Sequence, residues 1–300
     1  MWLYRDDELR SDVAVKALAD NWAQREDVRE RFLEEARILR AADSDHVVRV
    51  YDVGQAGDGG DVTPYFVMTY ADRGTIADLL KEGRVDLERV VSLVRQAGDG
   101  LAVLHAKGVV HRDIKPQNLL LASDGLGRER VMVADLGVAK ALIHASGLTD
   151  VVGTPAYMAP EQALGGGLDE RADVHGLAAV AYHLLTGHVA RSGGVSDLIH
   201  AKLPPAPSAF VPVSTEVDEV ILRGLEPDRE DRWPDVQSFV EALAATAPGA
   251  PATLYTRAGT PRRTPPSPSA GLPAAMLVVL CLVVALATFG ASYAVVELLQ

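Results

Sequence analysis

The sequence has 300 residues, with 29 Lys or Arg and 41 Asp or Glu, so its formal net charge at pH 7 is −12. Nucleic-acid phosphates repel a chain this acidic, which argues against DNA or RNA as a partner. The single cysteine, Cys281, and eight histidines without a metal-binding spacing exclude a disulfide framework and a Cys/His metal site.

The first part of the chain reads as a small sheet with one helix. Residues 12–18 alternate around Lys16 and predict a strand, whereas residues 26–39 have apolar side chains at helical spacing. Further strands are predicted at 47–53 and 65–70, and we expect the glycine- and aspartate-rich stretch that comes after residue 53 to be the turn between them.

Helical patterns dominate the next part of the chain. Residues 87–105 and 172–185 predict two long helices, and Gly108 and Gly187 stop them. The coarse prediction is therefore an α+β protein in which a small sheet domain precedes a larger helical domain.

The C-terminal part has a different composition. Residues 248–273 are rich in Pro, Ala, Thr and Ser, which predicts an extended linker. Residues 274–296 carry no charge and as a helix would measure about 34 Å, so we expect one transmembrane helix with a short far-side tail at 297–300. The only charges of the linker are positive, which predicts that residues 1–247 remain cytoplasmic. The linker charges are Arg257, Arg262 and Arg263.

Three short segments carry the groups that phosphoryl transfer requires. They read HRDIKPQN at 111–118, ADLG at 134–137 and GTPAYMAPEQ at 153–162. Moving a phosphoryl group to a hydroxyl needs a carboxylate to orient the hydroxyl, oxygen ligands for magnesium and a cation beside the phosphates.

Each requirement has a candidate in these segments or in the first strand. Asp113 offers the orienting carboxylate, and Asn118 and Asp135 offer the oxygen ligands. Lys16 and Lys115 offer the cations. A single Asp or Asn of this kind is often only a turn residue, but the combination favours a shared chemical role.

Together, the segments resemble the eukaryotic-like (Hanks-type) protein kinase family as found in bacteria, from about Trp2 to about Ala244. The resemblance implies a two-lobed fold with a β-rich N-lobe, a helical C-lobe and ATP held between the lobes with Mg²⁺, or Mn²⁺ in its place. Lys115, two residues after Asp113, and Thr154 both point to the serine/threonine branch.

The resemblance also implies site residues. The implied catalytic set is Asp113, Lys115, Lys16, Glu35 and Thr154. Nucleotide contacts are implied for Lys16, Ala14, Met68, Thr69, Ala71, Leu120, Asn118 and Asp135, the last two being the metal ligands. Glu35 fits the family's FxxEA pattern, although its neighbour Glu34 competes with it as the partner of Lys16, and Lys16 could also be a solubilising edge-strand residue.

Supporting roles are implied in the same way. Glu161 is expected to form an ion pair with Arg232. Asp173 is expected to accept hydrogen bonds from backbone amides of the catalytic loop (residues 111–118), to cap a helix, or both. An apolar stack between the lobes is expected from His111, Leu136 and Leu39.

Regulation is expected between Asp135 and Glu161. Arg112 is suited to pair with a phosphate on this segment, for which Thr149 is the first candidate and Ser146 the second. Both are otherwise ordinary loop residues.

The family's GxGxxGxV loop has no match here, because MWLYRDDELRSDVAVK resembles the part of the family's sequence that lies directly after that loop. Either the sequence as given starts after the loop, or the protein is a membrane-tethered pseudokinase that acts as a scaffold. We expect the first, and hence a membrane-anchored kinase that phosphorylates protein Ser/Thr hydroxyls and its own copies. A small-molecule phosphotransferase of related fold is a weaker alternative, because GTPAYMAPEQ typifies a peptide-docking platform.

Overall fold

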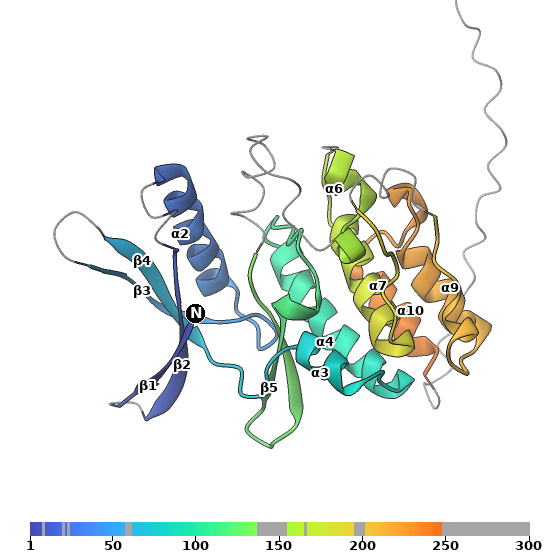
Figure 1. The fold of residues 1–300 in the computed structure, drawn as a ribbon, viewed down its shortest axis with the longest axis horizontal. Helices are drawn as coiled ribbons and strands as arrows, with labels where there is room; N and C mark the ends of the chain where they lie inside the picture. Colours follow the sequence, from blue (N-terminus) through green and yellow to red (C-terminus); the bar gives the residue numbers. More distant parts are fainter. Residues whose placement is uncertain are drawn as a thin grey trace, which may run out of the picture. The chain divides into compact units, whose positions relative to one another are not determined.

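The structure is a computed structural model that describes residues 1–7, 10–19, 22, 25–57, 62–136, 155–164, 167–194 and 202–247 (Figure 1). The predicted linker, transmembrane segment and tail lie outside these residues. Among the helices that are described, none is long and apolar enough to cross a membrane.

The N-terminal part is a four-stranded antiparallel sheet in the order β1-β2-β4-β3. Its strands are β1 (Trp2–Asp6), β2 (Ser11–Ala17), β3 (Val50–Ala56) and β4 (Thr63–Thr69). In β4, Pro64, Phe66 and Met68 are buried and alternate with half-buried residues, as expected when one face of a strand meets the core.

Helix α2 (Glu26–Ala41) packs against β3 and β4 (Figure 1). Its buried side chains recur at helical spacing and include Phe32, whose ring centroid lies 4.9 Å from that of Phe66. The helix therefore shares one apolar core with the sheet.

The predicted turn between the second pair of strands begins too early. Gly54 does not turn the chain but lies within β3, opposite Tyr65 of β4. A Cβ atom at Gly54 would come within 2.5 Å of the Tyr65 ring, so the ring covers the space of the missing side chain. The first residues of the predicted strand 47–53 are also not part of β3, because Val47 pairs with Val133 instead.

The remaining described elements form a mainly helical lobe that also contains a short β-hairpin. Its main elements are α3 (Ile76–Glu82), α4 (Leu87–His105), β5 (Leu119–Ser123), β6 (Glu129–Val133), α6 (Pro160–Leu164), α7 (Arg171–Thr186), α9 (Thr215–Gly224) and α10 (Val236–Ala245). Among the described residues, single-turn 3₁₀ helices lie at Pro116–Asn118, Pro155–Tyr157, Pro207–Ala209 and Arg229–Asp231.

Side-chain caps determine where several of these helices start. Thr75 and Asp78 form a capping box at α3, and Asp86 accepts a hydrogen bond from the Arg89 amide at the start of α4. Asp235 does the same for α10 with the amide of Ser238. Helix α4 has the bounds predicted for it, and α7 is one residue longer at each end than predicted.

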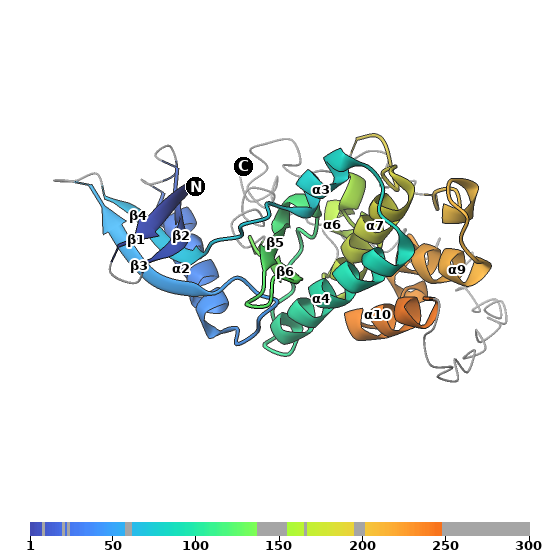
Figure 2. The same ribbon diagram turned by 90° about the horizontal axis from the view of Figure 1, so that it is seen from below.

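Helix α7 is the centre of the helical lobe. Fourteen of its residues are buried, and it packs against α4, α9 and α10 (Figure 2). A helix buried on every side has a mainly apolar sequence, and the buried polar exceptions in α7 are Asp173, His175 and Thr186.

Backbone hydrogen bonds join the sheet part to the helical lobe at two places. The amide of Val48 donates to the carbonyl of Val133, whose own amide donates to the carbonyl of His46. After β4, the amide of Arg73 donates to the carbonyl of Leu121. The start of β3 and the end of β4, which lie at the same end of this antiparallel pair, are thus both tied to the β5–β6 hairpin.

The first of these junctions predicts an intolerant glycine. A Cβ atom at Gly100 of α4 would lie 2.2 Å from the carbonyl oxygen of His46, a backbone atom with little freedom to move. Alanine improves helix propensity by about 1 kcal/mol, but overpacking of this kind costs about 3 kcal/mol. We therefore expect Gly100→Ala to lower the free energy of unfolding by about 2 kcal/mol in a denaturant titration.

Gly125→Ala is the matched control, because a Cβ atom there meets nothing within 4 Å. Its free energy of unfolding should change by less than about 0.5 kcal/mol. Equal stability of the two variants would show that the α4 contact with His46 is not close-packed.

Candidate active site

Lys16 of β2 joins three segments that are far apart in sequence. Its Nζ lies 2.8 Å from Oε1 of Glu35 on α2 and 2.7 Å from Oδ1 of Asp135, which comes after β6. Glu34, the alternative partner, faces away and pairs with Arg37. The structure thus places Glu35, and not Glu34, beside Lys16.

The charges of this trio are tightly coupled. Burial alone would lower the pKa of Lys16, but the carboxylates of Glu35 and Asp135 outweigh it and raise this pKa above its ordinary value. Burial raises the pKa of Glu35, and Lys16 and a hydrogen bond from the Leu136 backbone offset this only in part. Two carboxylates therefore share one ammonium group that stays protonated.

Asp113 is held by two side chains of its own loop. Its Oδ2 accepts a hydrogen bond from Nδ2 of Asn118 at 2.8 Å and lies 2.9 Å from Nζ of Lys115. Nδ2 of Asn118 also donates to the backbone carbonyl of Asp113 at 2.8 Å. These contacts fix the position of the Asp113 carboxylate and the orientation of the Asn118 amide.

Asp173, buried on α7, holds the backbone of the same loop. One carboxylate oxygen accepts from the amide of His111 at 2.7 Å and the other from the amide of Arg112 at 2.8 Å. The side chain does not cap α7: the N-cap residue Glu170 makes no side-chain cap, and the amide of Arg171 donates to Asp169. His105 at the end of α4 adds a third contact, with Nε2 2.8 Å from Asp173.

Two residues at the site have left-handed backbones. The φ angle is +67° at Arg112 and +57° at Asp135, and neither residue is glycine. Such conformations cost about 1–2 kcal/mol and persist where the surroundings enforce them, frequently at functional sites.

The three residues of the predicted apolar stack are all buried. Leu39 and Leu136 belong to the hydrophobic core, and His111 is fully buried with Nε2 2.9 Å from the carbonyl oxygen of Ala134. His111 therefore connects the catalytic loop to the residue just before Asp135.

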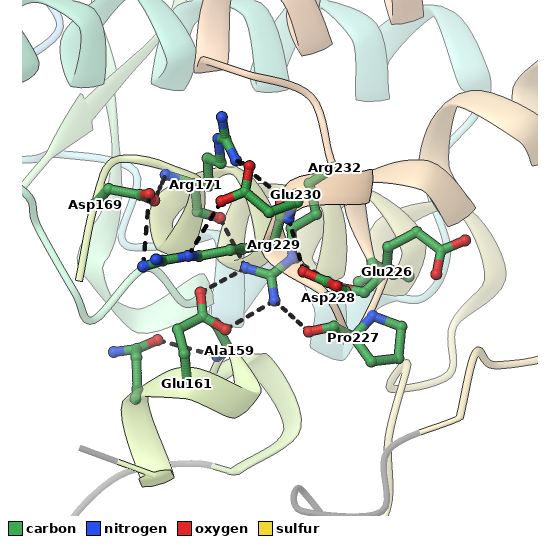
Figure 3. A network of polar contacts seen from close by, with 12 residues as sticks. Ala159, Glu161, Asp169, Arg171, Glu226, Pro227, Asp228, Arg229, Glu230 and Arg232 are labelled. Atoms are coloured by element: carbon green, nitrogen blue, oxygen red, sulfur yellow. Dashed lines mark hydrogen bonds and ion pairs between the residues drawn. The ribbon is translucent and has the colours of Figure 1, made fainter. Parts of the chain in front are cut away.

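Arg232 anchors Glu161 through a saturated set of hydrogen bonds (Figure 3). Its guanidinium lies 2.6 and 2.8 Å from the two carboxylate oxygens of Glu161 and also donates to three backbone carbonyls. All five donors of the buried guanidinium are used, so a lysine would not replace it. The three carbonyls belong to Arg171, Glu226 and Pro227.

Ion pairs surround this anchor at the surface. Arg171 lies 2.6 Å from Glu230, and Arg229 lies 3.8 Å from Asp169 (Figure 3). They join the segment before α7 to the 3₁₀ helix that precedes Arg232.

The residues predicted to line the nucleotide lie on β2, β4, the segment after β4, and β5. Ala14 pairs with Met68 across β2 and β4, and both are buried. Ala71 and Leu120 are half-buried against the core. The hydroxyl of Thr69 is within hydrogen-bond distance of Arg49 and Tyr51 on the β3 side, and its amide donates to the carbonyl of Arg49, so both groups are already engaged by this part of the sheet.

The predicted metal ligands offer hard oxygen atoms. Because Nδ2 of Asn118 donates twice to Asp113, its Oδ1 is the atom left for a ligand, and Oδ2 of Asp135 is the atom not bonded to Lys16. Magnesium retains waters and phosphate oxygens and needs only such a pair. The described residues contain no group of three His, Cys, Asp or Glu side chains that could hold a metal ion.

Two residues at the site were not predicted from the sequence, and three predicted residues lie outside the part of the chain that the structure describes. Gln162 contacts the catalytic loop from α6, and His105 contacts Asp173. The only hint of a role for Gln162 was its place at the end of GTPAYMAPEQ, and for His105 its place shortly before HRDIKPQN. Ser146, Thr149 and Thr154 lie outside the described residues.

Comparison with known proteins agrees with this geometry. Residues 3–239 match the model of the protein kinase domain. The serine/threonine-protein kinase Pkn1 of Myxococcus xanthus is 36% identical over 241 residues, which is 78% of this chain and 34% of the relative. PknB of Mycobacterium leprae is 33% identical over 240 residues, or 77% of this chain and 38% of the relative.

A third relative, the serine/threonine-protein kinase pkn2 of Myxococcus xanthus, is 32% identical over 273 residues, or 87% of this chain and 32% of the relative. The chain thus spans about a third of the length of these proteins. The family match covers most of the chain and includes every segment of the site described above. The chain therefore belongs to the protein kinase family, and the relatives it resembles are serine/threonine-protein kinases.

Proposed function

We propose that this chain transfers the γ-phosphoryl group of Mg·ATP to serine or threonine hydroxyls of proteins. The observation that carries the proposal is the contact of Lys16 with both Glu35 and Asp135, next to a loop in which Asp113 is held by Lys115 and Asn118. A pseudokinase scaffold has no need to keep all of these groups in contact.

Asp113 orients the acceptor. Its carboxylate, fixed through Oδ2, accepts a hydrogen bond from the acceptor hydroxyl. It takes up the proton as the new oxygen–phosphorus bond forms and the bond from the γ-phosphorus to the bridging oxygen breaks, with ADP as the leaving group. Lys115, 2.9 Å from that carboxylate, is placed to neutralise charge on the transferring group.

Lys16 positions the nucleotide phosphates. Its ammonium is held by Glu35 from one side, so it can serve the phosphates without a large change of position. Asn118 and Asp135 would hold the metal ion, which would supply positive charge beside the phosphates.

The membrane assignment is part of the proposal and rests on sequence. Segment 274–296 would anchor the catalytic part through the linker 248–273, whose flexible reach is roughly 25–30 Å. Anchoring raises the effective concentration of one copy toward another and so favours phosphorylation between copies.

The first prediction concerns the reaction. Asp113→Asn should lower kcat by about 10³-fold or more, because it removes the hydroxyl's proton acceptor, with nucleotide affinity nearly unchanged. Lys16→Met should weaken both. Phosphate transfer from labelled Mg·ATP and nucleotide binding by calorimetry are measured on two forms of the protein. One is the 300-residue chain, and the other is a chain extended at its N-terminus through an upstream glycine-rich loop.

Lys107→Met is the control for Lys16→Met, because Lys107 is an exposed lysine at the end of α4. It should retain the parent rate and affinity. Parent-like transfer by Asp113→Asn would overturn the assignment of Asp113, and a parent without ATP binding in both forms would favour the scaffold.

A second prediction concerns activation. We expect autophosphorylation within residues 138–153, first at Thr149, with a subsequent rise in rate as the phosphate pairs with Arg112. Thr149→Ala and Arg112→Gln should both abolish the rise, whereas Arg40→Gln, an exposed arginine of α2, should not. Mass spectrometry of active protein without phosphate on Ser146, Thr149 or Thr154 would contradict this mechanism.

A third prediction concerns the anchor. The full chain should remain in the membrane pellet after high-salt and alkaline carbonate washes, because burial of about twenty apolar residues does not depend on charge. Residues 1–247 alone should stay in the supernatant. Release of the full chain by carbonate would exclude a spanning helix.

A further inference from the structure

Gln162, the residue after Glu161, bridges α6 and the catalytic loop. Its Oε1 accepts a hydrogen bond from the amide of Ala159 at 3.0 Å, and its Nε2 donates to the carbonyl of Arg112 at 2.6 Å. The two partners fix the orientation of the side-chain amide, since a backbone N–H can only donate and a carbonyl can only accept.

The Arg112 backbone is therefore held from both sides. Its amide donates to Asp173 of α7, and its carbonyl accepts from Gln162 of α6. This is the residue with φ of +67°, a conformation that a residue with a side chain adopts when its neighbours enforce it. The next peptide along the chain carries Asp113.

The helix that carries Gln162 is held in place by its neighbouring residue. Its neighbour Glu161 is bound to the buried guanidinium of Arg232, which also bonds three backbone carbonyls. Gln162 also lines a small pocket whose other walls include Arg112 and Asp113. The contact to Arg112 thus transmits the position of an anchored helix to the catalytic loop.

We propose that Gln162 is a positioning residue: it holds the Arg112–Asp113 peptide in its left-handed form and so aims Asp113 at the acceptor hydroxyl. Because Gln162 comes just after the segment that carries the expected phosphosites, it also couples the C-terminal end of that segment to the catalytic loop. The effect on catalysis rests on the phosphoryl transfer proposed above, whereas the effect on the loop backbone does not.

Two substitutions separate this role from capping of α6. Gln162→Leu removes both hydrogen bonds at similar volume. Gln162→Glu keeps an oxygen to accept from Ala159, but its carboxylate cannot donate to the carbonyl of Arg112 and repels it. A purely structural cap would be lost only in the first variant, whereas loop positioning would be lost in both.

Gln96→Leu is the matched control. Gln96 on α4 also accepts from a backbone amide, that of Val131 at 3.0 Å, but it does not contact the catalytic loop. This variant should lower the melting temperature and leave kcat unchanged.

The experiment measures steady-state kinetics and amide hydrogen exchange on all three variants and the parent. We expect Gln162→Leu and Gln162→Glu to lower kcat about tenfold with KM for ATP unchanged. Exchange at the amides of residues 111–113 should be faster in both, and should match the parent in Gln96→Leu.

Parent-like kcat together with parent-like exchange at residues 111–113 in Gln162→Glu would overturn the inference. If the parent itself shows no phosphoryl transfer, the proposed function fails, but the exchange result still decides whether Gln162 holds the loop.

Discussion

The geometry of the catalytic loop depends on one buried carboxylate, that of Asp173. A charge taken out of water is destabilising unless its oxygens are fully bonded, and here the backbone amides of His111 and Arg112 and the ring of His105 supply the donors. The carboxylate belongs to α7, a largely buried helix that is surrounded by other helices. The catalytic loop is therefore attached to a well-packed part of the lobe. Ile114 packs close to Gly176 on the next turn of that helix and completes the attachment.

Around this loop, the site combines segments that no single element could bring together. Lys16 comes from the sheet, Glu35 from α2 and Asp135 from the end of the β5–β6 hairpin. These ion pairs form only when all three segments are in place. A shift of any one segment separates the charges and leaves the Glu35 carboxylate, only 3% exposed, without its cation. The contacts among Lys16, Glu35 and Asp135 therefore depend on the relative position of the sheet, α2 and the hairpin.

Much of this was predictable from the sequence, for identifiable reasons. The bounds of α4 were predictable from periodicity and a stopping glycine, and the two-lobed fold from the order of the strand and helix patterns. The position of Gly54 within a strand was not predictable, because it depends on the ring of Tyr65 from a neighbouring strand. The same holds for His105 and Gln162, whose partners lie 68 and 50 residues away in sequence, so that no local pattern marks them. The hairpin β5–β6 was missed because its short strands lie among the catalytic motifs and lack a long alternating pattern.

The hydrogen bonds between residues 46–48 and Val133 have a mechanical consequence for α2. They fasten the chain just beyond the C-terminal end of this helix to the hairpin of the other lobe, so this end of α2 is the pivot of any tilt of the helix against the sheet. Glu35 lies seven residues before the cap residue Ala42, hence about 10 Å from that pivot at the helical rise. A rotation of about 10° would displace its carboxylate by about 2 Å, which is enough to break a hydrogen bond to Lys16. A small tilt of α2, without unfolding of the helix or any change in the sheet, is thus sufficient to break the contact between Glu35 and the ammonium group of Lys16.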